Sequence, residues 1–196
     1  MGIRRSSYLI HTPYHKGPDG NLQAAWAGME AVKLSGKARS IGVSNYEESH
    51  LATTLATAKV APSVNQLEFH PYLQHGDLLP FSRDHGGGIA TAAYGALHPV
   101  THNIAGPLDQ TLERLSVKYG VSIGLICLRW CIAQNVIVIT TSQKPERMAE
   151  YLHVFDFKLT SEEVQEISRT GIDCLKGEEL LPRVIYYYRM VEEKSK

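Results

Sequence analysis

Residues 39–46, which read RSIGVSNY, contain the transition that decides the fold of this chain. The short apolar run from Ser40 to Val43 has the length and composition of a buried strand, and the polar pair Ser44-Asn45 follows it at once. Before the strand, apolar side chains recur at helical spacing between Asn21, which can cap a helix, and Gly36, which suits a left-handed helix end. The stretch therefore predicts a helix, a turn and a strand with a polar end.

The same unit repeats along the chain. Asn45 is expected to cap a helix that runs to about Ala58, with Glu48 completing a capping box. Further strands are predicted at Tyr8–Ile10, Val64–Phe69, Ile89–Ala93 and Val136–Ile139, and further helices at Asp77–Asp84, Leu108–Tyr119, Ile123–Gln134, from Pro145 and after the capping box Thr160–Glu163. A long loop is expected from Gly95 to Gly106, and a tail from about Gly171.

Strands that alternate with helices indicate parallel βαβ units. Polar residues end nearly every strand, as at the active face of a (β/α)₈ barrel, whereas the glycine-rich phosphate turn of a doubly wound sheet is absent from the sequence. The five predicted strands fall short of the eight that a closed barrel needs. We therefore expect an α/β fold: a partial TIM (β/α)₈ barrel of about five parallel βα units, residues 1–159, with a C-terminal helix and tail, residues 160–196, in the same single domain.

Composition narrows the class of partner. The 20 basic residues balance 20 acidic ones, which argues against a nucleic-acid or anionic-membrane partner, and no apolar run is long enough to cross a bilayer. Three cysteines, Cys127, Cys131 and Cys174, indicate a reducing compartment, and the first two are expected to be small core residues. A cytoplasmic location is expected.

Five segments carry a resemblance to a known family. The most specific is Met29–Tyr46, and the others read LIH at residues 9–11, VNQLEFHPY at 64–72, LRW at 128–130 and VFDF at 154–157. In this order, and at these predicted strand ends, they resemble the aldo-keto reductases. The resemblance covers the chain from Tyr8 onward and implies an NADP(H)-dependent reduction of a small aldehyde or ketone to an alcohol.

Three polar groups near two strand ends suit a nicotinamide carboxamide. Ser44 offers a hydroxyl, while Asn45 and Gln66 offer amides. Tyr94, at the next strand end, is placed to stack on the ring. The resemblance implies that these residues, together with Gly95 and Leu97, hold the cofactor. Read without the resemblance, Asn45 caps its helix and Gln66 pairs with backbone.

The segment from Thr140 to Arg147 joins the last strand to a helix N-terminus, where backbone N–H groups favour a phosphate. The resemblance implies that Ser142 and Arg147 bind the adenosine 2′-phosphate and that Glu150 lies near the adenine, with Thr141 also counted among the cofactor-binding residues. Three positions depart from the commonest family pattern: Thr140 stands for Pro, Thr141 for Lys and Tyr151 for Asn. Some fungal members carry Thr-Thr-Ser here. The lost lysine leaves the preference for NADPH over NADH open.

His11 matches the histidine that orients the substrate carbonyl in the family. The family's catalytic Asp, Tyr and Lys lie before this strand, and only seven residues precede Tyr8 here, so an N-terminally truncated, catalytically incomplete chain is expected. Tyr14 is the convenient substitute phenol, but without a nearby cation it is a poor acid at neutral pH. The histidine pairs His11/His15 and His98/His102 lie in Pro-containing loops, and no metal is expected there.

Three readings therefore stay open. The sequence belongs to a carbonyl reductase of which these residues are a part. Alternatively, it is a catalytically dead nucleotide-binding or partner subunit derived from that fold. In the third, it is a remnant that folds poorly unless another chain completes the barrel, because open strand edges favour aggregation.

Overall fold

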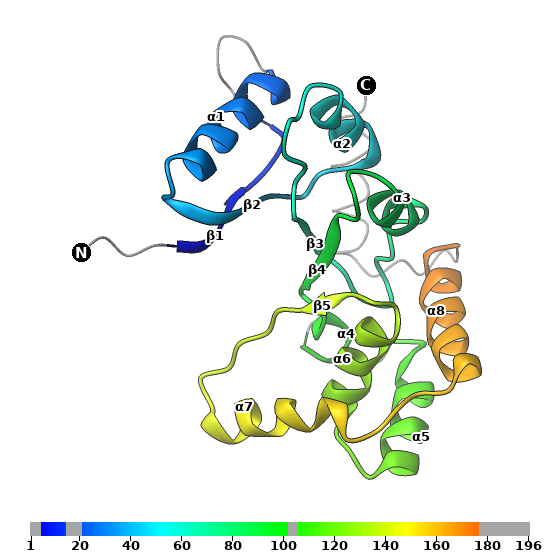
Figure 1. The fold of residues 1–196 in the computed structure, drawn as a ribbon. Helices are drawn as coiled ribbons and strands as arrows, with labels where there is room; N and C mark the ends of the chain where they lie inside the picture. The colour runs from blue at the N-terminus through cyan, green and yellow to red at the C-terminus, as the bar shows by residue number, and fades with distance from the viewer. Residues whose placement is uncertain (1–4, 15–20, 102–105, 177–196) are drawn as a thin grey trace. The chain divides into compact units, whose positions relative to one another are not determined.

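The structure, a computed structural model, describes residues 5–14, 21–101 and 106–176 of the 196-residue chain. The chain divides into two compact units, one formed by residues 1–67 and 75–92 and the other by residues 68–74 and 93–196. Within the described ranges five strands form one parallel sheet in the order β1-β2-β3-β4-β5, and helices separate them along the chain (Figure 1). The predicted fold class, a partial (β/α)₈ barrel, is confirmed. The predicted assignment of all residues to a single domain stays a prediction.

The first unit begins with three strand–helix pairs. Its elements are β1 (Arg5–Ile10), α1 (Leu22–Leu34), β2 (Ala38–Ser44), α2 (Glu48–Leu55), β3 (Val64–Glu68) and α3 (Leu78–Asp84), followed by the start of β4 (Ala90–Tyr94). Strands β1 and β2 pair in parallel with Tyr8 opposite Ile41, and β2 pairs with β3 with Ser44 opposite Gln66. This register brings the polar ends of β2 and β3 to the same edge of the sheet.

Helix α1 covers the apolar strands of this unit. As predicted, Asn21 caps it by accepting hydrogen bonds from the backbone of Gln23 and Ala24. Trp26, which is 1% exposed, packs in the core with Ile41 and donates its indole N–H to the Val60 carbonyl at 2.9 Å. The buried indole thus keeps its one donor satisfied, which holds α1 in place.

The predicted start of α2 is wrong. Asn45 does not cap the helix; Glu47 is the N-cap residue, and the capping box joins Glu47 to His50. The backbone of Asn45 is left-handed, with φ of 60°, whereas an N-cap residue is normally extended. Asn45 therefore belongs to the strand end, two residues before the N-cap residue Glu47.

The second unit is mainly helical. It contains α4 (His98–Thr101), α5 (Asp109–Tyr119), α6 (Ile123–Ala133), β5 (Ile137–Val138), α7 (Pro145–Leu152), the 3₁₀ turn η1 (His153–Phe155) and α8 (Ser161–Lys176). Two predictions need correction here. The expected long loop after β4 holds the short helix α4, and the expected tail from Gly171 is still α8, which runs on to Lys176.

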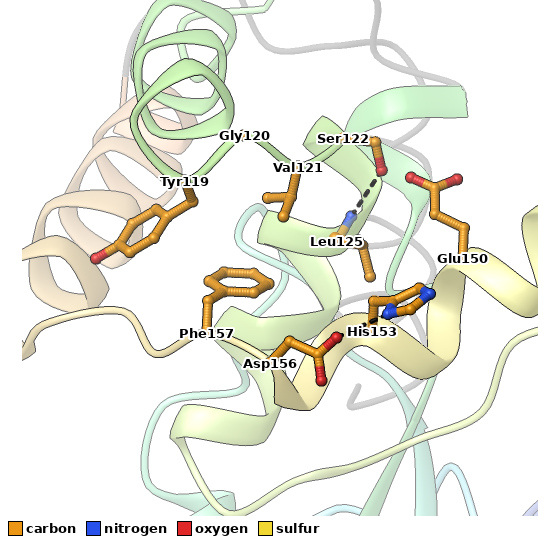
Figure 2. Close-up of a pocket in the computed structure, with 9 residues that line it drawn as sticks. All are labelled: Tyr119, Gly120, Val121, Ser122, Leu125, Glu150, His153, Asp156 and Phe157. Atoms are coloured by element: carbon orange, nitrogen blue, oxygen red, sulfur yellow. Dashed lines mark hydrogen bonds and ion pairs between the residues drawn. The ribbon is translucent and has the colours of Figure 1, made fainter.

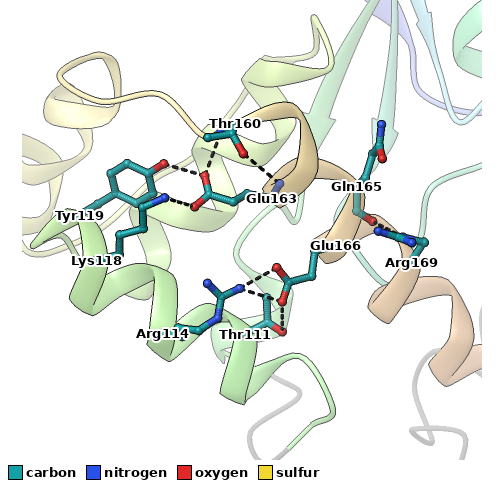
Figure 3. Close-up of polar contacts among 9 residues, drawn as sticks. All are labelled: Thr111, Arg114, Lys118, Tyr119, Thr160, Glu163, Gln165, Glu166 and Arg169. Atoms are coloured by element: carbon teal, nitrogen blue, oxygen red, sulfur yellow. Dashed lines mark hydrogen bonds and ion pairs between the residues drawn. The ribbon is translucent and has the colours of Figure 1, made fainter.

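Polar contacts fasten α8 to α5 (Figure 3). Glu163 accepts hydrogen bonds from Lys118 and Tyr119, each at 2.6 Å, and completes the predicted capping box with Thr160. Burial by itself raises the pKa of Glu163, but the bonds from Lys118 and Tyr119 outweigh burial and lower it. The carboxylate is therefore held in its charged form, where it serves both the cap and the helix pair.

Two of the cysteines behave as expected. Cys127 and Cys131 are free thiols with no exposed surface, and burial raises the pKa of Cys127 to about 12. The prediction that they are small core residues is confirmed.

Among the described helices none is long and apolar enough to cross a membrane alone. The pair α5 and α6, with a bend of 94° between the two helices, has the combined length and composition for a span, which by itself is weak evidence of one.

Candidate functional site

Two neighbouring strand ends in the first unit bring the predicted nicotinamide residues together. Ser44 Oγ donates to the Gln66 carbonyl at 2.7 Å, and the backbone N–H of Asn45 donates to the same oxygen at 2.9 Å. Ser44, Asn45 and Gln66 therefore occupy one small area at the carboxyl ends of β2 and β3. Residues at such ends form the active face of (β/α)₈ barrels.

Asn45 is held in an unusual backbone conformation. Its φ of 60° lies in the left-handed region, which residues with a side chain seldom adopt and which recurs at functional sites. The side-chain nitrogen donates to the His11 carbonyl at 2.9 Å and to Ser44 Oγ at 3.2 Å. The amide is thereby fixed in orientation, and it also ties the end of β1 to the end of β2.

The buried residue Asn65 supports this strand end, a role that is not predicted from the sequence. Asn65 has no exposed surface; its amide donates to the Tyr46 carbonyl at 2.8 Å and accepts from the Tyr46 N–H at 3.3 Å. It clamps the residue directly after Asn45 and so stabilises the left-handed turn. A polar residue inside an apolar strand run was the signal that could have revealed it.

His11 and Tyr14 lie just after β1, in the same unit. Both are exposed at their side chains. Burial of part of the ring and the Glu47 carboxylate raise the pKa of Tyr14 above its ordinary value. The phenol therefore holds its proton more tightly than an average tyrosine, which makes Tyr14 a poorer general acid.

The second unit contains the other predicted cofactor residues. Tyr94 ends β4, and Gly95 follows with a left-handed φ of 68°, which turns the chain toward Leu97 and α4. Tyr94 is half-buried; burial and the Glu68 carboxylate raise its pKa. The raised pKa keeps the Tyr94 phenol protonated, and its ring offers an aromatic face for stacking.

Thr141, Ser142 and Arg147 lie on and after the connection from β5 to α7. Ser142 Oγ accepts a hydrogen bond from the backbone N–H of Lys144 at 3.1 Å, which shapes the turn before the helix. The Thr141 and Arg147 side chains are exposed. The segment thus presents a cation beside a helix N-terminus, the arrangement that favours a phosphate.

Glu150, the residue predicted to lie near the adenine, lines a cavity of about 350 Å³ (Figure 2). The other walls come from the turn between α5 and α6, from η1 and from Phe157, and Asp156 pairs there with His153 at 2.7 Å. Thr141, Ser142 and Arg147 do not line it. The volume lies at the lower end of the range for small-molecule pockets.

A further polar cluster in the second unit is not predicted from the sequence. Glu68 at the end of β3, His70 two residues later and His98 at the start of α4 meet there. Burial by itself raises the pKa of Glu68, but hydrogen bonds from the two imidazoles outweigh burial and lower it to about 2. The spacing of Glu68 and His70, which places both side chains on one face of an extended segment, was an available signal. His15 and His102, considered as metal ligands from the sequence, lie outside the described residues.

The predicted site residues therefore form two groups. His11, Ser44, Asn45 and Gln66 lie in the first unit, where hydrogen bonds connect them. The second unit holds the rest: Tyr94, Gly95, Leu97, Thr141, Ser142, Arg147 and Glu150. The first group occupies strand ends and the residues just after them, whereas Arg147 and Glu150 of the second group lie in α7.

The chain matches known proteins over most of its length. The model of the Aldo/keto reductase family matches residues 6–171. An NADPH-dependent alpha-keto amide reductase of Saccharomyces cerevisiae is 38% identical over 174 residues, which are 85% of this chain and 55% of that protein. An NADP-dependent D-sorbitol-6-phosphate dehydrogenase of Malus domestica is 38% identical over 158 residues, 75% of this chain and 49% of that protein.

Solved structures of aldo-keto reductases resemble this chain in both fold and sequence. The aldo-keto reductase of Bombyx mori in complex with NADP has a TM-score of 0.75 and 33% identity, over 84% of this chain and 57% of that one. An aldo/keto reductase of Brucella melitensis has a TM-score of 0.73 and 32% identity, over 84% of this chain and 60% of that one. The chain thus spans about half the length of the curated relatives that it matches.

Proposed function

Because the chain belongs to the aldo/keto reductase family, we propose that it binds NADP(H) and contributes to the reduction of a small aldehyde or ketone to an alcohol. The named relatives include an NADPH-dependent reductase and an NADP-dependent dehydrogenase, and the bound NADP of the Bombyx mori structure supports the same cofactor. When bound, the nicotinamide supplies a hydride. The role of this chain's residues is to bind the cofactor and to orient its nicotinamide ring.

The observation that carries the proposal is the set of hydrogen bonds that connects the carboxyl ends of β2 and β3. The Ser44 hydroxyl accepts a hydrogen bond from the Asn45 amide, and both residues also bond to the backbone carbonyl of Gln66. The Gln66 side chain adds a second amide at the same strand end, and a carboxamide needs such donors and acceptors. The left-handed backbone at Asn45 keeps its amide at the strand end. These features fit a nicotinamide carboxamide. Considered by itself, the Arg147 guanidinium has the chemistry that binds a phosphate group.

Gln66→Ala is expected to weaken NADPH binding about 3- to 10-fold, the loss of one neutral hydrogen bond. The measurement is an NADPH titration of the whole chain followed by tryptophan fluorescence. Gln23→Ala is the matched control: Gln23 lies on α1 and donates to the Thr53 carbonyl at 3.2 Å, so NADPH affinity should not change. Equal losses in both variants, or an unmodified chain that binds no NADPH, would refute the proposal.

The purified 196-residue chain is expected to oxidise NADPH with a generic aldehyde no faster than buffer does. The family resemblance implies four catalytic residues, of which this 196-residue sequence contains His11. The substitute phenol, Tyr14, has a raised pKa and is therefore a poor proton donor. The decrease of NADPH absorbance measures the rate. Turnover that disappears in Tyr14→Phe would show that this phenol delivers the proton, contrary to our expectation. Turnover that persists unchanged in both His11→Ala and Tyr14→Phe would indicate a contaminating enzyme.

A further inference from the structure

Three metal-binding side chains converge in the second unit: Glu68, His70 and His98. Their ligand atoms lie within 4.8 Å of one another. Glu68 Oε1 is 2.5 Å from His98 Nδ1 and 3.6 Å from His70 Nε2. One carboxylate oxygen and two imidazole nitrogens therefore face a common point.

The backbone around Gly95 permits this approach. Gly95 has a left-handed φ of 68°, and its carbonyl accepts the His98 N–H at 2.8 Å. A Cβ on residue 95 would lie 3.2 Å from Glu68 Cγ and 3.4 Å from His98 Cε1. A side chain here would crowd both ligands, so the glycine leaves room for the cluster.

The cluster is partly preorganised and open on one side. The His70 side chain is 3% exposed and that of Glu68 16%, whereas 33% of the His98 side chain reaches solvent. The His70 ring packs edge-on against Tyr72, at 6.4 Å between ring centres, and its backbone pairs with Leu73. A buried imidazole, a largely covered carboxylate and a second imidazole that reaches solvent give an ion a path of entry.

We propose that Glu68, His70 and His98 bind one divalent cation of the Zn²⁺ type. Two imidazoles and a carboxylate form a common three-residue set for Zn²⁺, whereas Mg²⁺ and Ca²⁺ prefer all-oxygen ligands. Tetrahedral bonds of about 2.0–2.1 Å put ligand atoms roughly 3.4 Å apart. The Glu68–His98 pair therefore opens by about 1 Å on binding, a side-chain adjustment, and the fourth position is left to water.

The test uses the whole chain, stripped of metal with a chelator, and Zn²⁺ alone as the probe. Competition with a chromogenic chelator should show one equivalent of Zn²⁺ that His98→Ala and Glu68→Gln each weaken by at least about 10-fold. His153→Ala is the matched control, since His153 also pairs with a carboxylate, Asp156 at 2.7 Å, outside the cluster. Its Zn²⁺ affinity should equal that of the unmodified chain.

Thermal stability provides a second readout. Zn²⁺ should raise the melting temperature of the unmodified chain and of His153→Ala, and should do so much less for His98→Ala and Glu68→Gln. Circular dichroism of the metal-free variants verifies that they are folded. Equal Zn²⁺ affinity in His98→Ala and the unmodified chain, equal losses in His98→Ala and His153→Ala, or no bound Zn²⁺ in the unmodified chain would each overturn the proposal.

Discussion

Trp130→Ala is expected to lower the free energy of unfolding by about 3–5 kcal/mol, the usual cost of removing a fully buried large aromatic side chain. Trp130 has no exposed surface, and its ring stacks on Phe69 with 5.2 Å between ring centres. Its indole N–H donates to Ser168 Oγ at 3.0 Å and is shared with the Val164 carbonyl at 3.3 Å. The truncation therefore removes the packing between α6 and the segment after β3 as well as a link to α8.

Urea unfolding followed by far-ultraviolet circular dichroism measures this loss. Trp130→Phe is the control, because it keeps most of the ring volume and removes the indole donor; we expect a markedly smaller loss than for alanine. Equal losses for the two variants would show that the hydrogen bonds to α8, and not the packing on Phe69, carry the stability. The alanine variant should also weaken Zn²⁺ binding, since Phe69 lies between Glu68 and His70.

Gly171→Ala is expected to destabilise the chain by about 1–3 kcal/mol or more, although alanine favours helices. A Cβ on residue 171 would overlap the Pro71 carbonyl oxygen and lie 2.6 Å from its carbon. The Pro71 segment cannot move away freely, because Gln74 Nε2 ties Pro71 to the Ser168 carbonyl by bonds of 2.6 and 2.8 Å. Helix α8 must therefore shift.

Gly28→Ala provides the matched comparison. Gly28 is also a glycine inside a helix, α1, but a Cβ there would meet nothing within 4 Å. We expect it to stabilise the chain by about 0.5–1 kcal/mol, the helix-propensity gain alone. Denaturant midpoints of the two variants should therefore move in opposite directions. A stabilising Gly171→Ala would mean that α8 does not pack on Pro71.

The two glycines show where sequence reasoning reaches its limit. Both stand in helical sequence patterns, but the sequence predicts a tail from about Gly171, whereas α8 continues through it. Both in fact lie inside helices, and whether alanine can replace the glycine depends on the neighbour across the interface. That neighbour, Pro71, lies 100 residues away in the chain, and no local pattern reports it.

Asn45 shows the same limit at the candidate site. Its residue type and position were sufficient to predict a polar strand end, and the structure places it there beside Ser44 and Gln66. Its expected role as a helix cap was wrong, because hydrogen bonds to the ends of β1 and β3 hold its backbone left-handed. Those partners come from other strands, so local propensity could not rank the two roles.

By itself the sequence determined the alternation of strands and helices, the polar strand ends and the family, because hydrophobic periodicity and short motifs are local properties. Only the tertiary structure decided which distant side chains meet. Glu68 and His70 are neighbours in the sequence, but His98 reaches them through the left-handed turn at Gly95. The shape of that turn, and the carboxylate–imidazole cluster that it completes, result from packing between segments 28 residues apart.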